Sequence, residues 1–186
     1  REWRENREEF LASRGIVHRD IAARNIMVDM RETCKVGDFG LSRSIGKEQG
    51  NYLFQARKLP LKWMPPESIE KYYFSTATDV WSFGILLFEI MTLGGTPYAG
   101  WLMAELFNRL KRGERMEKPD NCTDKLYEIM CKCWADLPSN RPTFTVLRKQ
   151  LAELLEDAQQ GDYDYYLKLN AKAHYYVLES SAYDLI

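Results

Sequence analysis

Three side chains in the first quarter of the sequence are of types that could take a proton and bind a divalent cation. Asp20, Asn25 and Asp38 supply two carboxylates and one amide within a short stretch. Phosphoryl transfer asks a protein mainly to orient the attacking hydroxyl and to neutralise charge on the phosphates. A carboxylate beside the hydroxyl, with an amide and a second carboxylate on Mg²⁺, is sufficient for one half of such a site. The three residues therefore indicate phosphoryl-transfer chemistry.

These residues belong to two short motifs, each of which would be a weak signal alone. His18-Arg19-Asp20 could be a chance tripeptide in a loop, and Asp38-Phe39-Gly40 could be an ordinary turn. The motifs occur in this order, however, with β-favouring runs between them at 26–28 and 34–36. A hairpin made of those runs would hold the amide and the second carboxylate at its two ends. The combination favours a functional site over coincidence.

Residues 18–25, followed by Asp38-Phe39-Gly40, resemble the catalytic loop and the metal-binding loop of protein kinases. The order His-Arg-Asp-Ile-Ala-Ala-Arg-Asn is the form used by tyrosine kinases. The resemblance implies that Asp20 is the catalytic base. It also implies that Asn25 and Asp38 hold Mg²⁺ and, with it, ATP.

The same loops carry residues with acceptor, packing and control roles in that family. Ala22 stands where serine and threonine kinases have a lysine near the transferred phosphate, so the resemblance favours tyrosine as the acceptor. Arg24 would help to position the phosphoryl group and the phenolic oxygen. His18 is expected to be a packed, hydrogen-bonded turn residue, while Phe39 and Gly40 form a regulatory packing switch.

Control by phosphorylation is a further implication. Arg19 is a cation beside the base, and in the family it stays uncompensated until a negative group arrives from the activation loop. We expect that loop at residues 41–59, a long polar stretch without periodicity. Tyr52 lies in its middle, and its phosphorylation would add about −1.5 to −2 charges. The alternative is that Tyr52 is an ordinary exposed loop residue.

Three downstream segments also resemble kinase motifs. Residues 59–67 resemble the segment that receives the substrate, and residues 79–84 resemble the start of the central helix. Residues 140–144 resemble the segment that pairs with residues 59–67. The resemblance implies a buried ion pair between Glu67 and Arg141. It also implies that Asp79 holds the backbone of the His18-Arg19 turn.

Composition limits the partners and the compartment. The 186 residues carry 26 Lys and Arg against 27 Asp and Glu, a net charge of −1, so we expect no nucleic-acid partner. The four cysteines form no Cys-x-x-Cys pair and are expected to be reduced thiols. The longest apolar run, residues 80–93, contains Glu89 and is shorter than the ~20 residues that a bilayer requires. We therefore expect no membrane segment in this chain.

Apolar periodicity predicts a mainly α fold. Helices are expected at 79–93, 101–112, 125–134 and from a cap at Thr143 to about residue 157. Together with the resemblance, this pattern predicts the large, C-terminal lobe of a protein-kinase-like fold with a short β-hairpin. No glycine-rich loop, strand lysine or partner glutamate precedes the first motif, so we expect the small lobe to be absent and the chain to be a fragment.

We assign residues 1–158 to this incomplete kinase domain and residues 159–186 to a flexible, tyrosine-rich tail. Six of the eleven tyrosines lie in the tail. Tyr166, Tyr176 and Tyr183 are each followed closely by aliphatic residues, so their phosphorylated forms are expected to bind phosphotyrosine-binding adaptor domains. The alternatives are packing of these rings onto the lobe and a membrane-traffic sorting signal.

The sequence thus predicts a protein tyrosine kinase whose intact parent transfers the γ-phosphate of ATP, with Mg²⁺, to tyrosine hydroxyls of proteins. The run 93–98 resembles receptor kinases, which implies a receptor dimer with this domain on the cytosolic side of the plasma membrane. The fragment alone is expected to be inactive. The alternative is a non-catalytic kinase-lobe protein that acts as a binding module or competitor, and the upstream gene sequence would distinguish the two.

Overall fold

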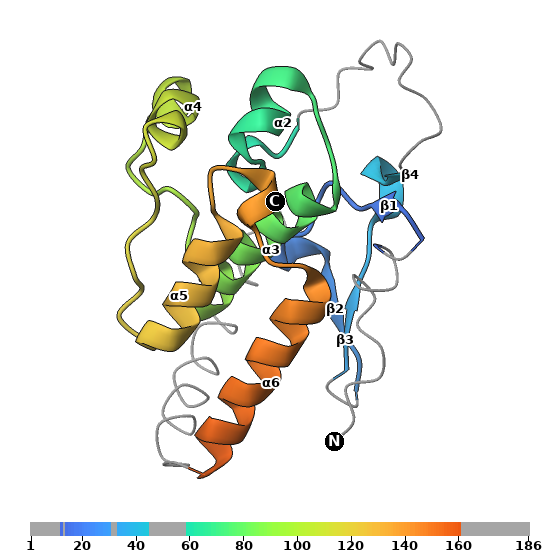
Figure 1. The fold of residues 1–186 in the computed structure, drawn as a ribbon, viewed down its shortest axis with the longest axis vertical. Helices are drawn as coiled ribbons and strands as arrows, with labels where there is room; N and C mark the ends of the chain where they lie inside the picture. The colour runs from blue at the N-terminus through green and yellow to red at the C-terminus, as the bar shows by residue number, and fades with distance from the viewer. Residues whose placement is uncertain (1–11, 13, 31–32, 45–58, 161–186) are drawn as a thin grey trace, which may run out of the picture. The chain divides into compact units, whose positions relative to one another are not determined.

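The structure is a computed structural model that describes residue 12 and residues 14–30, 33–44 and 59–160 (Figure 1). The chain divides into two compact units, Arg1–Arg148 and Lys149–Ile186, and each is described by itself. Tyr52 and the three tail tyrosines proposed as docking sites lie outside the described residues. The expected boundary between residues 158 and 159 stays a prediction.

Two short antiparallel ribbons carry the two motifs at residues 18–20 and 38–40. Strand β2 (Ile26–Val28) pairs with β3 (Cys34–Val36), so the predicted hairpin is confirmed at the predicted residues (Figure 1). Strand β1 (Ile16–Val17) pairs with β4 (Arg43–Ser44), which was not predicted. Both motifs are therefore flanked by strands: residues 18–20 follow β1, and residues 38–40 lie between β3 and β4.

Helices make up most of the rest. They are α2 (Pro66–Lys71), α3 (Thr76–Met91), α4 (Met103–Lys111), α5 (Asp124–Cys133) and α6 (Phe144–Gln160). Four 3₁₀ turns complete the described elements: η1 (Ala23–Asn25), η2 (Phe39–Leu41), η3 (Leu61–Trp63) and η4 (Pro138–Asn140). The four predicted helices are present, and α6 begins at the predicted cap, where Thr143 Oγ1 accepts a hydrogen bond from Val146 N.

Helix α3 is the centre of the first unit. Trp81 and Ile85 on this helix have no exposed surface, and α3 packs against α5. Gly84 allows the close approach, since a Cβ there would lie 2.6 Å from the indole nitrogen of Trp134 and 2.7 Å from Cβ of Cys133. Figure 1 shows α3 between α5 and the β2–β3 ribbon. The loops that follow the strands therefore have a rigid, buried support.

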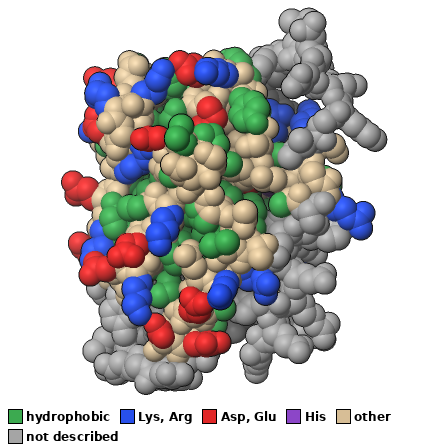
Figure 2. All heavy atoms as spheres, viewed as in Figure 1, with side chains coloured by type: hydrophobic (Ala, Val, Ile, Leu, Met, Phe, Trp, Pro, Cys, Tyr) green, Lys and Arg blue, Asp and Glu red, His purple; other side chains and the backbone are tan. Residues whose placement is uncertain are grey.

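The surface shown in Figure 2 carries both signs of charge. Over α4 and α5 the basic and acidic side chains are interspersed, with apolar groups between them. Among the described residues, no helix combines the length and the hydropathy that a membrane span needs. All four cysteines are free thiols, and those at 122 and 133 are buried.

Candidate active site

The carboxylate of Asp20 is held by two donors from its own loop. The turn η1 places the side chains of Arg24 and Asn25 next to this carboxylate. Nδ2 of Asn25 donates to Oδ2 of Asp20 at 2.9 Å and to its backbone oxygen at 2.7 Å. The guanidinium of Arg24 pairs with Oδ1. Because Asp20 is 9% exposed, these contacts fix the direction in which a nearly buried carboxylate can accept a proton.

The second motif lies against the same loop. The N–H of Gly37 donates to the carbonyl of Asn25 at 2.8 Å, which places the following residue, Asp38, beside η1. Asp38 adopts a left-handed backbone (φ 52°), which Asp tolerates better than most residues. Its Oδ1 accepts a hydrogen bond from Gly40 N at 3.1 Å, which stabilises that conformation.

The donor set of this site fits a phosphate-bound magnesium ion. No described residue donates a hydrogen bond to Oδ1 of Asn25 or to Oδ2 of Asp38, so one amide oxygen and one carboxylate oxygen are left for a cation. The described part of the chain contains no cluster of three or more His, Cys, Asp or Glu that could hold a metal. Mg²⁺ commonly takes one or two protein ligands and completes its shell with phosphate and water, so this set suffices.

His18 is neutral and structural in this geometry. Its Nδ1 accepts the N–H of Asp20 at 3.3 Å, so its proton resides on Nε2, which lies 3.0 Å from the carbonyl of Gly37. Burial lowers the pKa of His18 below its ordinary value, although the Gly37 carbonyl and two nearby carboxylates oppose this. Phe39 packs edge-on against the imidazole, with 4.8 Å between ring centroids. The imidazole therefore links the two motifs as a packed hydrogen-bonding residue.

This lowered pKa predicts that stability depends on pH. In the unfolded chain His18 is protonated near pH 6.5, whereas in the folded chain it is protonated only at a lower pH. The free energy of unfolding should therefore fall as the pH drops below about 6.5 and level off below the folded pKa. The free energy of unfolding is measured by denaturant titration at several pH values between 7.5 and 5.5. It should change less with pH in His18→Gln than in the wild type, with His174→Gln as the control. An unchanged pH dependence in His18→Gln would contradict the assignment.

Asp79 of α3 supports the turn that carries Asp20. Its Oδ2 accepts from the backbone N–H of His18 at 2.7 Å and its Oδ1 from that of Arg19 at 2.8 Å, as the resemblance implied. Arg19 has φ 72°, a strained conformation for a residue with a Cβ. Two charge-assisted hydrogen bonds at the strained peptide offset that cost.

The side chain of Arg19 is half-buried. Its guanidinium lies 4.0 Å from the ring centroid of Phe74, and its Nε has no hydrogen-bond partner among the described residues. Burial lowers the pKa of Arg19, and the nearby charge of Arg43 acts in the same direction. The control roles expected for Arg19 and Tyr52 both stay predictions.

The ion pair expected between Glu67 and Arg141 is present across 74 residues of sequence. Nη1 of Arg141 donates to Oε1 at 2.7 Å and Nη2 to Oε2 at 3.0 Å, a bidentate arrangement. The Arg141 side chain is fully buried and also donates to the carbonyls of Ala135 and Ala77. The pair therefore ties the N-terminal turn of α2 to the segment before α6.

Two functional candidates were missed in the sequence. Glu89 is 8% exposed, and its Oε2 accepts hydrogen bonds from Ala23 N at 3.0 Å and from the indole Nε1 of Trp63 at 2.9 Å. The same indole also contacts Arg24, whose guanidinium lies 4.4 Å from the ring centroid. The available signal was a single carboxylate, Glu89, within the apolar run 80–93.

A carboxylate oriented by its own loop, beside oxygen ligands suited to a phosphate-bound cation and anchored on a buried helix, is the arrangement of a protein kinase. Residues 8–151 match the family described as protein tyrosine and serine/threonine kinase, and the chain belongs to that family.

The chain is similar to several receptors. It is 46% identical to a fibroblast growth factor receptor of Hydra vulgaris over 154 residues, which cover 83% of this chain and 19% of that protein. It is 47% identical over 155 residues to the tyrosine-protein kinase receptor torso of Bombyx mori, covering 83% and 19%. It is 48% identical over 157 residues to platelet-derived growth factor receptor alpha of Homo sapiens, covering 83% and 14%. The chain thus spans less than a fifth of the length of these relatives.

Proposed function

We propose that this chain is the large lobe of a receptor-type protein tyrosine kinase. The intact parent would transfer the γ-phosphate of ATP to tyrosine hydroxyls of proteins. The observation that carries the proposal is the carboxylate of Asp20, held by Arg24 and Asn25 on a loop that Asp79 fixes to the core. The mainly helical content supports the assignment to the large lobe, and the similarity to receptor kinases supports the assignment to the receptor type.

The residues divide the chemistry between them. ATP with Mg²⁺, which kinases of this family use, would supply the phosphoryl group and neutralise part of its charge. Asp20 would orient the acceptor hydroxyl and take its proton as the phenolic oxygen bonds to the γ-phosphorus and the bond from that phosphorus to the ADP oxygen breaks. Asn25 and Asp38 would hold the cation through the oxygens that have no described partner. Arg24, which already contacts Asp20, would stabilise negative charge on the phosphoryl oxygens.

The partners follow from the same proposal. The parent would lie in the plasma membrane, with this domain on the cytosolic side, and would act as a dimer on protein substrates that contain tyrosine. Phosphorylated Tyr52 would pair with Arg19, and Tyr166, Tyr176 and Tyr183 would bind adaptor domains after phosphorylation. The similarity to receptors supports the membrane location and the dimer.

Acceptor specificity tests the proposal. The intact parent is incubated with Mg-ATP and three peptides that differ only in having Tyr, Ser or Phe at the acceptor position. We expect phosphate in the tyrosine peptide alone, and none in any peptide when the 186-residue chain is tested by itself. Absence of transfer by the intact parent would overturn the enzyme proposal in favour of a binding module, and equal transfer to Ser would overturn the tyrosine assignment.

A further inference from the structure

The side chain of Glu89 lies where two functional segments meet. The catalytic loop reaches it through the backbone N–H of Ala23, and the substrate-receiving segment 59–67 reaches it through the indole N–H of Trp63. Both donors bond to the same oxygen, Oε2, at 3.0 and 2.9 Å. A single atom of α3 therefore sets the distance between the two segments.

Burial of the Glu89 carboxylate in the core costs free energy of solvation. The side chain is almost completely buried, and no Lys or Arg of the described chain forms an ion pair with it. A buried carboxylate is tolerated only when donors satisfy it, and the two N–H groups do so here. The compensation depends on both segments being in place, so the carboxylate favours the assembled arrangement over either segment alone.

Trp63 transmits this arrangement to the base. One edge of its indole is bonded to Glu89, and the guanidinium of Arg24 lies 4.4 Å from its ring centroid. Arg24 in turn pairs with Asp20. The backbone of Trp63 is held independently, because the hydroxyl of Ser82 donates to its carbonyl at 2.7 Å. The ring is thereby fixed from two sides, and the arginine has one well-defined surface on which to lie.

We propose that Glu89 is a positioning residue that aligns the acceptor-binding segment with Asp20 through the indole of Trp63. This inference rests on the proposed function, because it names the group that sets how well a peptide tyrosine is presented to the base. The residue touches neither substrate nor nucleotide in this scheme. Its loss should therefore weaken use of the peptide acceptor and leave use of ATP unchanged.

Trp63→Phe in the intact parent is the primary test, since it removes the indole N–H and keeps an aromatic face for Arg24. It leaves the Glu89 carboxylate with one donor fewer, and kcat/KM for a tyrosine peptide should fall about tenfold, mainly through KM, with KM for ATP unchanged. The matched control is Trp101→Phe, another half-buried tryptophan beneath an arginine, whose ring centroid lies 3.8 Å from the guanidinium of Arg109. That variant should retain the wild-type KM for the peptide.

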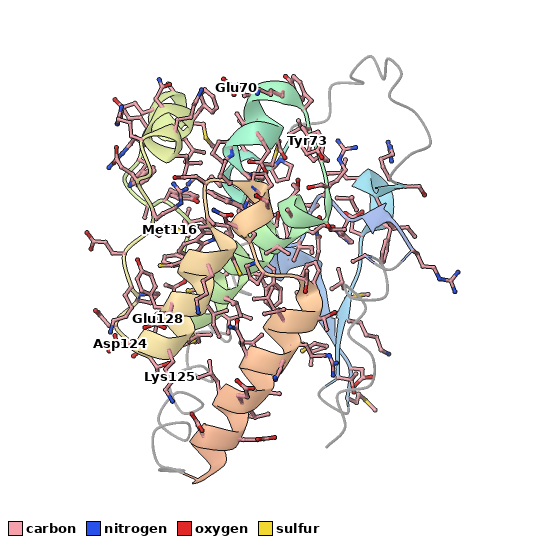
Figure 3. All side chains as sticks on the ribbon, viewed as in Figure 1. Glu70, Tyr73, Met116, Asp124, Lys125 and Glu128 are labelled. Carbon is pink, nitrogen blue, oxygen red and sulfur yellow. The ribbon has the colours of Figure 1, made fainter. Side chains whose placement is uncertain are left out.

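Variants of Glu89 identify the interaction responsible. Glu89→Gln keeps an acceptor oxygen and should retain most of the activity, whereas Glu89→Leu should raise KM for the peptide. Combining Glu89→Leu with Trp63→Phe should add little to Glu89→Leu alone, because both remove the same hydrogen bond. Glu128→Gln, at an exposed position of α5 labelled in Figure 3, serves as the carboxylate control.

Hydrogen–deuterium exchange gives a measurement that does not depend on activity. The amides of Trp63 and Met64 donate to the carbonyls of Pro60 and Leu61, and Glu89→Leu should accelerate their exchange in the intact parent. If Glu89→Leu accelerated this exchange but the parent phosphorylated nothing, the result would overturn the proposed function and still support the contact between Glu89 and Trp63. An unchanged KM for the peptide in an active Trp63→Phe parent, or equal rises in KM for peptide and ATP, would overturn the positioning role.

Discussion

Replacement of Asp20 by Asn in the intact parent should lower kcat by about 10²–10⁴-fold, the usual contribution of a general base. The amide keeps the shape of the side chain but has one acceptor oxygen where the carboxylate has two, so Arg24 and Asn25 cannot both remain satisfied. The two oxygens proposed to hold the cation, Oδ1 of Asn25 and Oδ2 of Asp38, are not replaced, so the larger effect should be on kcat and not on KM for ATP. Steady-state kinetics with a tyrosine peptide measure the effect.

The control for this change is Asp120→Asn, an exposed carboxylate outside the site. It should behave as wild type in both kcat and KM. If Asp20→Asn retained most of the wild-type kcat while unfolding at the wild-type temperature, Asp20 would not be the base. A loss of activity with a large fall in unfolding temperature would instead assign the residue a structural role.

Glu67→Ala should cost about 3–5 kcal/mol of folding free energy, because it leaves a fully buried guanidinium without its counter-charge. The remaining contacts of Arg141 to three backbone carbonyls satisfy hydrogen bonds and not charge. Urea unfolding of the intact parent would show the loss as a lower midpoint. Replacing both partners, with Arg141→Leu added, should recover part of the loss, since an apolar pair avoids burying an unpaired ion.

Helix α2 provides a matched control on its exposed side. Glu70, labelled in Figure 3, forms an ion pair with Lys111 of α4 at 2.9 Å, and both side chains are solvent-accessible. Glu70→Ala should therefore have a much smaller effect, because an exposed ion pair is screened by water and salt. Equal losses from Glu67→Ala and Glu70→Ala would show that burial of the first pair has no energetic consequence.

Local patterns were sufficient to predict the parts of the fold that depend on neighbouring residues. The hairpin at 26–28 and 34–36 was predicted because β-favouring runs and a polar turn are adjacent in the sequence. The start of α3 was placed three residues late. Residues 76–78 have no apolar period, and the helix is capped by Ser75 and Thr78, not by the more usual Glu or Gln at the third position.

Contacts between distant residues were predictable only where a family resemblance supplied them. The resemblance implied the Glu67–Arg141 pair and the role of Asp79, and both contacts are present. Glu89 was noted in the sequence only as a charge that argues against a membrane span. Periodicity shows which face of a helix is apolar, but it does not show which backbone N–H groups meet a carboxylate on that face. Helix α2 was missed because it is only six residues long.

Helix α3 fixes functional segments by its length as much as by its composition. Asp79, Ser82 and Glu89 lie within about 80° of one another around the helix axis at 3.6 residues per turn. They hold the His18-Arg19 turn, the carbonyl of Trp63 and the N–H of Ala23, respectively. One residue inserted between Ser82 and Glu89 would rotate the carboxylate by about 100° relative to the other two anchors. Insertions and deletions within the helix would therefore separate the loop that carries Asp20 from the segment that carries Trp63.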